Sequence, residues 1–109
     1  MTDKKEIRDQ YKNREITGGV YAVKNTQSGK ILLESTADLQ GAQNRFEFSV
    51  KTGSPAFVKL QRDWNAGNFT FEVLDPLTKK DTQSDKEFSD DIAALKEIWT
   101  EKLSGTPMY

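Results

Sequence analysis

Two short apolar runs separated by a turn-rich segment are the feature that most restricts how this chain can fold. The runs are residues 20–23 and 31–33, and the segment between them, residues 25–30, contains Gly29. Glycine reaches positive φ at little steric cost, so this arrangement predicts an antiparallel β-hairpin. Because the second run is apolar without a break, we expect it to lie in the middle of the sheet.

The region after the hairpin has the spacing of helices. Apolar residues recur every three or four positions over residues 39–50, which predicts a helix that ends at Gly53. Pro55 is expected to open a further helix, which Gly67 stops.

The last part of the chain adds a strand and the most regular helical pattern. Residues 69–73 alternate between apolar and polar side chains, which predicts a half-buried strand that Asp75 and Pro76 end. Over residues 88–103 the apolar side chains follow the spacing of one helical face. With a short helix expected over residues 3–13, this order predicts an α+β domain, in which helices pack on a small three-stranded, mainly antiparallel sheet.

Length and composition limit the domain count and the kinds of active site. A chain of 109 residues suits one compact domain. We expect an N-terminal helical extension over residues 1–17, the folded domain over residues 18–104 and a C-terminal tail over residues 105–109. The charged residues (30%) and the mean hydropathy of −0.75 exclude a membrane span.

The sequence contains no cysteine and no histidine. This excludes disulfides and thiolate metal sites, and it removes the commonest general base and the commonest zinc ligand. The charged N-terminal residues lack the apolar core of a signal peptide, so we expect a cytoplasmic protein.

Charge is distributed unevenly, although the formal net charge is only −1. Residues 40–66 contain four basic and two acidic side chains, whereas residues 81–101 contain seven acidic side chains and two lysines. Both segments can simply be solvated helix faces. The basic segment can also contact phosphates, which arginine and lysine bind with release of counterions.

Several residues of the predicted hairpin match a known pattern. Gly19-Val20-Tyr21, followed by Asn25, Gly29-Lys30, Ser35 and Leu39, resembles the opening of GIY-YIG nuclease domains, in which a Gly-Ile-Tyr strand and a Tyr-Ile-Gly strand form a hairpin. The later segments that resemble small bacterial members of that superfamily are Asn44-Arg45, Leu60-Gln61, Asp63-Trp64-Asn65, residues 69–74 and residues 95–103. The resemblance covers residues 18–103 and implies a GIY-YIG-like fold for almost the whole domain.

The resemblance implies cleavage of nucleic-acid phosphodiesters with one divalent metal ion. In that family two tyrosines activate or position water, an arginine stabilises phosphate charge, and a glutamate on a helix binds the metal. These residue types suit the chemistry, because a hard cation such as Mg²⁺ prefers carboxylate oxygen and developing phosphoryl charge prefers guanidinium.

The strand motifs of the chain match this set only in part. Tyr21 stands at the first-motif position, where the alternative is an aromatic strand residue with its hydroxyl at the sheet edge. The second motif reads Leu32-Leu33-Glu34, so both its phenol and its glycine are replaced.

The helical site positions also depart from the family. In strict register the family's arginine falls on Ala42. Arg45, three residues later on a neighbouring row of the helix, is therefore the candidate. The alternative is that Arg45 is a surface arginine paired with a carboxylate. The metal-binding glutamate falls on Lys96, and the adjacent Glu97 is expected to face water. We therefore expect no metal ligands, and Mg²⁺ or Mn²⁺ as a cofactor only if the chain is an active nuclease.

Three functions from different classes follow. The first is a nuclease-like domain that binds nucleic acid weakly, with DNA preferred, and in which cleavage is impaired or lost. The second is an active divalent-metal-dependent DNA endonuclease that uses Arg45 with Glu34 or Glu97. The third is a protein-interaction module, in which the acidic final helix or Phe48 contacts a partner, and burial of Phe48 in the monomer would remove that argument.

The first two functions share most candidate residues. The catalytic candidates are Tyr21 and Arg45, and the nucleic-acid-binding candidates are Lys24, Lys51, Lys59 and Arg62. Trp64 and Trp99 lie at apolar positions of their helical patterns, so we expect them to pack in the core rather than to stack on bases.

Overall fold

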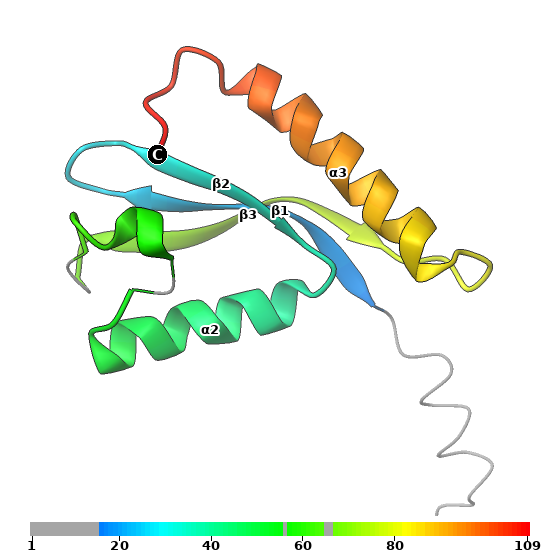
Figure 1. Cartoon of the computed structure of the whole chain (residues 1–109), viewed down its shortest axis with the longest axis horizontal. Helices are drawn as coiled ribbons and strands as arrows, with labels where there is room; N and C mark the ends of the chain where they lie inside the picture. Colours follow the sequence, from blue (N-terminus) through cyan, green and yellow to red (C-terminus); the bar gives the residue numbers. More distant parts are fainter. Residues whose placement is uncertain (1–15, 56, 65–66) are drawn as a thin grey trace, which may run out of the picture.

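The computed structural model describes residues 16–55, 57–64 and 67–109, and Figure 1 shows the arrangement of the elements. In chain order these are β1 (Thr17–Asn25), β2 (Ile31–Thr36), α2 (Leu39–Thr52), the 3₁₀ helix η1 (Val58–Leu60), β3 (Phe69–Thr78) and α3 (Asp85–Lys102). The predicted α+β class, with helices packed on a small three-stranded sheet, is confirmed. The helix expected over residues 3–13 lies outside the described residues.

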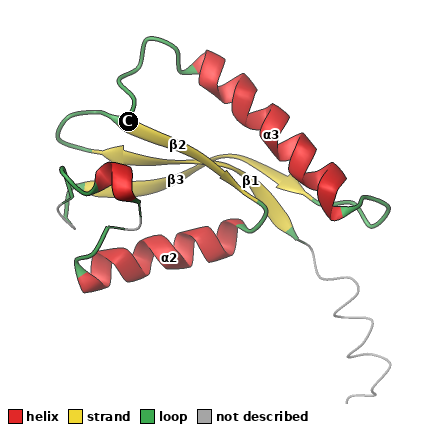
Figure 2. Cartoon of the chain, in the orientation of Figure 1, coloured by secondary structure: helices red, strands yellow, loops and turns green. Residues whose placement is uncertain are grey.

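β1 is the central strand, because the strands lie in the order β2-β1-β3 with both pairs antiparallel. The predicted hairpin is confirmed, but the expectation that its second run lies in the middle of the sheet is wrong. The run is apolar throughout because α2 and α3 cover opposite faces of the sheet (Figure 2). Leu32 packs in the cluster that contains Phe46 of α2, and the neighbouring Leu33 is buried on the opposite face.

β3 continues through Asp75 and Pro76, where the sequence predicted its end. Its pairing with β1 shifts register between Val20 and Tyr21, which places a bulge there and Pro76 opposite Gly19. An edge strand tolerates proline, because a missing N–H on its outer side breaks no ladder bond. Gly19 has a φ of 141°, and a Cβ on it would collide with the carbonyl oxygen of Asp75, so the close approach of β3 next to the bulge needs glycine here.

Capping side chains define the ends of the two long helices, which are those that the apolar spacing predicted. Asp38 precedes α2, and its carboxylate accepts a hydrogen bond from the backbone N–H of Gly41 at 3.0 Å; the helix ends at Gly53. Ser84 precedes α3 and forms a reciprocal capping box with Glu87. Among the described residues, no helix combines the length and the apolar character needed to span a bilayer.

The helix predicted from Pro55 is wrong, because only Val58–Leu60 form a short 3₁₀ turn there. Phe57 before it is extended, with φ −128° and ψ 133°, so no continuous helix runs through this point. Leu60 is nevertheless fully buried, and Phe57 and Trp64 pack partly buried against the core. The apolar spacing identified the inward-facing side chains but not the backbone conformation of this segment.

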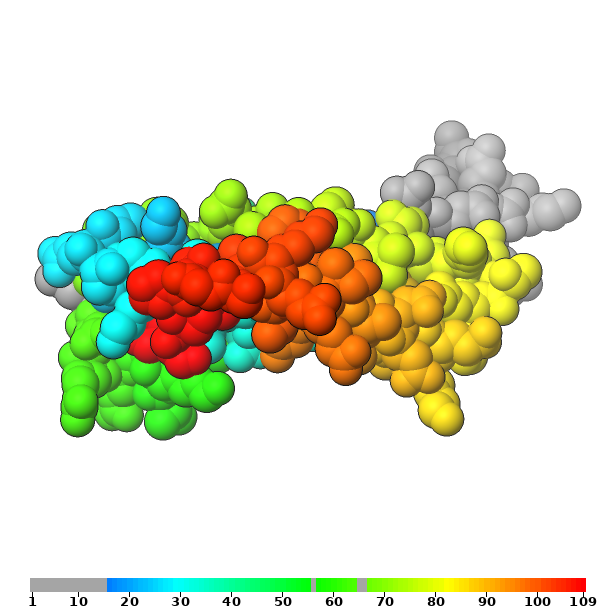
Figure 3. Space-filling model, turned by 90° about the horizontal axis from the view of Figure 1, so that it is seen from above, coloured from blue at the N-terminus to red at the C-terminus, as the bar shows by residue number. Residues whose placement is uncertain are grey.

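The main core lies between the sheet and α2. Its buried members are Tyr21, Val23, Leu32, Leu39, Ala42, Phe46, Leu60 and Phe69. The opposite face of the sheet is covered by α3, whose Phe88 and Ile92 are buried. In the space-filling view, α3 and the C-terminal residues run as one band across that face (Figure 3).

The segment expected as a C-terminal tail over residues 105–109 lies along β2. The backbone N–H of Ile31 donates to the carbonyl oxygen of Pro107, and the N–H of Tyr109 donates to the carbonyl oxygen of Ile31, both at 3.0 Å. The Tyr109 side chain packs against the main core. These residues therefore extend the sheet edge as well as the core.

Candidate functional site

Tyr21 lies on the central strand and faces the α2 side of the sheet. Only 4% of the residue is exposed, and its ring stacks on Phe71 with centroids 4.8 Å apart. Glu34 of β2 is its direct cross-strand partner, so the two side chains share one face of the sheet. The pairing places the carboxylate of the altered second motif beside the phenol of the first motif.

Burial and two charged side chains shift the pKa of the Tyr21 phenol. Burial is the main cause that raises the pKa of the phenol above its ordinary value of 10.0; the Glu34 carboxylate raises the pKa further, and the Arg45 guanidinium lowers it. The charges of Glu34 on β2 and Arg45 on α2 therefore both act on the phenol of Tyr21 on β1. With this direction of shift the phenol keeps its proton at neutral pH and can donate a hydrogen bond.

Arg45 lies on the exposed side of α2. Ala42, which holds the position in strict register, is buried in the core and carries no polar group. No ion pair of Arg45 with a carboxylate occurs within the part of the chain that the structure describes. The alternative of a surface arginine paired with a carboxylate thus receives no support from this part of the chain.

Lys96 of α3 reaches the same site from the other side of the edge strand. Its Nζ lies 4.0 Å from Oε2 of Glu34, and the two side chains are 39% and 28% exposed. The resemblance assigns the metal-binding glutamate to this position, which here holds a cation paired with the nearest carboxylate.

The donor set at this site does not fit a divalent metal ion. Across residues 16–55, 57–64 and 67–109, no group of three or more histidine, cysteine, aspartate or glutamate side chains is placed to hold one. Glu97 is exposed, as expected from its place on the helix, and Glu34 faces the ammonium of Lys96. We therefore derive no catalytic step through a metal ion.

The structure separates the predicted nucleic-acid-binding residues. Lys51, Lys59 and Arg62 are exposed on α2, on η1 and just after it. Lys24 is also exposed, but side chains alternate along β1, so it projects from the face opposite to Tyr21 and Val23. Lys24 does not share a surface with the other three.

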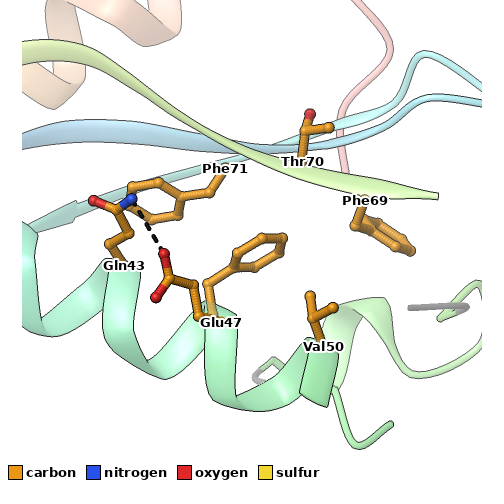
Figure 4. A pocket seen from close by; sticks show the side chains of 7 residues that line it. Gln43, Glu47, Val50, Phe69, Thr70 and Phe71 are labelled. Atoms are coloured by element: carbon orange, nitrogen blue, oxygen red, sulfur yellow. Dashed lines mark hydrogen bonds between the residues drawn. The ribbon is translucent and has the colours of Figure 1, made fainter. Parts of the chain in front are cut away.

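A groove of about 460 Å³ between α2 and β3 lies next to Tyr21 and was missed from the sequence. Figure 4 shows the rings of Phe69 and Phe71 on one side of it and Val50 on the other. Gln43 also lines it and donates a hydrogen bond to Glu47 at 3.4 Å. No spacing rule pairs these residues, since the groove forms only when the third strand packs against α2.

A polar cluster at the hairpin end was also missed. The Tyr109 hydroxyl donates to Asp63 and accepts from the Asn25 amide, both at 3.0 Å, while Asn68 donates to Asn25 at 3.3 Å. These residues are up to 84 positions apart in the chain, so no local signal could join them. The cluster fastens the C-terminal residues and the segment before β3 to the hairpin.

Trp64 packs against the main core, as the sequence predicted, whereas Trp99 is only partly buried and does not belong to that core cluster. Trp64 stacks on Phe69 with centroids 5.0 Å apart. The Trp99 indole N–H donates to the Asp75 carboxylate at 3.0 Å and thereby ties α3 to the bulged part of β3.

A three-stranded antiparallel sheet that opens with a hairpin, with one long helix on each face, is the architecture of the GIY-YIG fold, and the predicted fold is confirmed. The structure is similar to the catalytic domain of the homing endonuclease I-TevI, with a TM-score of 0.53 and 24% sequence identity, over 79% of this chain and 87% of that chain. It is also similar to a mutant catalytic domain of the intron endonuclease I-TevI, with a TM-score of 0.58 and 22% identity, over 81% of this chain and 84% of that chain. No protein-family model and no curated protein sequence matches the chain.

Proposed function

We propose that this chain is a nuclease-like domain that binds nucleic acid and has lost most or all cleavage. The observation that carries the proposal is the ion pair between Glu34 and Lys96 beside Tyr21. It puts an ammonium where the resemblance requires a carboxylate. We also propose the cytoplasm as the compartment.

The loss of cleavage follows from the charges at the site. Phosphodiester hydrolysis requires preorganised positive charge at the phosphoryl oxygens and an oriented water, and removal of one such group typically costs ~10²- to 10³-fold in rate. Here Leu32 replaces the second phenol and Lys96 replaces the metal ligand, so two groups are missing together. Arg45 and Tyr21 alone can hold a phosphate, by charge and by hydrogen bonding.

The capacity to bind is supported by the basic side chains around α2 and η1. Arg45, Lys51, Lys59 and Arg62 are all exposed, whereas α3 on the opposite face carries six carboxylates and three lysines. Four phosphate contacts predict a slope of about −3 to −4 for log affinity against log salt on a duplex. Such binding is weak at physiological salt and strong only in dilute buffer.

Fluorescence anisotropy with labelled DNA at low salt tests this function. We expect saturable binding that weakens steeply as salt is added, and Arg45→Ala should weaken it about 5- to 10-fold through the loss of one charged contact. Lys86→Ala removes the same charge from α3 and is the matched control, with no expected effect. Absence of binding by the unmodified protein at low salt would refute the proposal.

A cleavage assay with Mg²⁺ or Mn²⁺ separates this function from an active endonuclease. We expect no cut product above the background seen with chelator. Cleavage that disappears both with chelator and in Tyr21→Phe would establish the endonuclease instead. Cleavage that survives Tyr21→Phe would point to a contaminating nuclease.

A protein-interaction module is the second candidate, and the exposure of Phe48 favours it. The ring lies on α2 and the residue is 66% exposed, so burial in the monomer does not remove this candidate. The two functions separate in the anisotropy experiment, since a domain that only binds proteins gives no salt-dependent signal with DNA.

A further inference from the structure

Phe48 stands at the centre of the outer face of α2. Helical geometry of 100° per residue places Arg45 and Lys51 about 60° to either side of it, one turn before and one turn after. Asn44 and Thr52 lie within about 40° of Phe48 on the same face. All five residues are exposed. We call this set the Phe48 face.

The Phe48 face carries two cations and no carboxylate. Glu47 is about 100° away around the helix and accepts the hydrogen bond from Gln43 at the groove, where Figure 4 shows it. Within the described ranges, neither Arg45 nor Lys51 forms an ion pair or a side-chain hydrogen bond. Both charges are therefore free to meet an external anion.

Among the described residues, no other large exposed hydrophobic side chain accompanies Phe48 on α2. The other large exposed hydrophobic residues among those described are Ile16, Val58, Val73, Ile98 and Met108, none of which lies on α2. A protein interface usually has a contiguous apolar centre with several buried side chains. A single ring between cations instead suits a flat apolar partner that carries negative charge on each side.

A nucleotide in a single strand has this chemistry. Its base offers a flat π-face, and the phosphates that flank it are anionic. Arg45 and Lys51 are ~9 Å apart along the helix axis, with Phe48 midway, and both side chains are long enough to reach phosphates on either side of one base. Bases inside a duplex are already stacked, so they cannot present a face to the ring.

We propose that Phe48 is a stacking platform for an unpaired base of single-stranded nucleic acid, with Arg45 and Lys51 holding the flanking phosphates. This inference rests on the proposed function and specifies the form of nucleic acid that the domain prefers. Single strands, flaps and bulges therefore bind more tightly than a fully paired duplex of equal length.

The test compares a labelled single-stranded oligonucleotide with its matched duplex at low salt. Phe48→Leu keeps an apolar side chain but removes the π-face, and it should weaken single-strand binding about 5- to 150-fold while changing duplex binding less than about 2-fold. Phe48→Trp keeps a ring and should bind the single strand at least as tightly as the unmodified protein. Val58→Ala removes an even more exposed apolar side chain outside this face and is the control, with no expected change.

The possible failures are distinguishable. If Phe48→Leu binds the single strand as well as the unmodified protein does, or loses both substrates equally, the stacking role is wrong and the proposed function still stands. If the unmodified protein binds neither substrate, both proposals fall. Circular dichroism melts verify that each variant is folded, and if Phe48→Leu is not, weaker single-strand binding by Phe48→Trp overturns the inference.

Discussion

Nζ of Lys96 lies 4.0 Å from Oε2 of Glu34 and joins α3 to the edge strand β2 beside the Tyr21 ring. The pair is partly exposed, so its net contribution to folding stability is at most about 1 kcal/mol. Its importance is chemical, because it leaves a cation where a metal-dependent hydrolase needs an anion. Under the proposed function, replacement of Lys96 alone should therefore change what this site can bind.

Replacing Lys96 with a carboxylate should create a site for a divalent cation. In Lys96→Glu two carboxylates face each other, so we expect a lower melting temperature in chelator and a gain when Mn²⁺ is added. At ten times its dissociation constant, a bound ion stabilises the fold by about 1.4 kcal/mol. At about 2.1 cal/mol/K per residue, this corresponds to about 6 °C in a domain of this size. The measurement is a thermal melt with and without Mn²⁺.

The control for this experiment is Lys86→Glu, which makes the same charge change on the same helix. It should show no specific gain with Mn²⁺. If the unmodified protein gained as much as Lys96→Glu, the unaltered site would already hold a metal, contrary to our reading of its donor set.

The raised pKa of Tyr21 predicts a loss of folding stability at alkaline pH. The pKa of the phenol in the folded protein lies above 10.0, mainly through burial, whereas in the unfolded chain it is near 10.0. The unfolded state therefore releases its proton first, and the stabilisation that is complete below pH ~10 disappears as pH rises through the pKa of the folded state.

Urea unfolding from pH 8 to 11 measures this dependence. Tyr109 also has a raised pKa, so the contribution of Tyr21 is the difference between the unmodified protein and Tyr21→Phe. Glu34→Gln removes one cause of the shift, so at constant burial it lowers the pKa of Tyr21 in the folded protein and should make the alkaline loss of stability smaller. A Tyr21→Phe variant with the same alkaline slope would contradict the prediction.

The bulge between β1 and β3 predicts a strong effect of a single methyl group. Gly19→Ala combines a φ of 141° with a collision against the carbonyl oxygen of Asp75, so we expect a loss of about 1–3 kcal/mol or more in the free energy of unfolding. Gly29→Ala is the matched control, because Gly29 also has a positive φ (78°) but a Cβ there meets nothing within 4 Å. Its expected cost is only about 1–2 kcal/mol. Equal losses in urea unfolding would show that the collision is relieved.

Local patterns were sufficient for the regular elements of the fold. Helical spacing identified α2 and α3, Gly53 identified the end of α2, and the turn at Gly29 identified the hairpin. The end of β3 was misplaced at Pro76 because a proline stops a strand only where its N–H is needed, and the sequence does not say which strand lies at the edge. The prediction that β2 lies in the middle of the sheet was wrong for the same reason.

The candidate site was less predictable, since it depends on contacts between distant elements. The positions of Tyr21 and Arg45 could be taken from a resemblance, but the ion pair of Glu34 with Lys96 spans 62 positions, by their numbering in the chain. Whether Lys24 shares a face with Lys51 depends on the alternation along β1 and the side on which α2 packs. Residue spacing alone specifies neither this ion pair nor the face on which Lys24 lies.

Lys24 and Lys51 give the last prediction, because they lie on different faces of the domain. Lys51 lies on the Phe48 face, whereas Lys24 projects from the opposite side of the sheet. Lys51→Ala should therefore weaken DNA binding and reduce the magnitude of the salt slope by about 0.9 on a duplex, the value for one phosphate contact. Lys24→Ala, with the same change in net charge, should leave the slope unchanged. Anisotropy titrations at several salt concentrations measure both slopes, and an equal decrease in the two variants would show that DNA binding is governed by net charge rather than by the α2 surface.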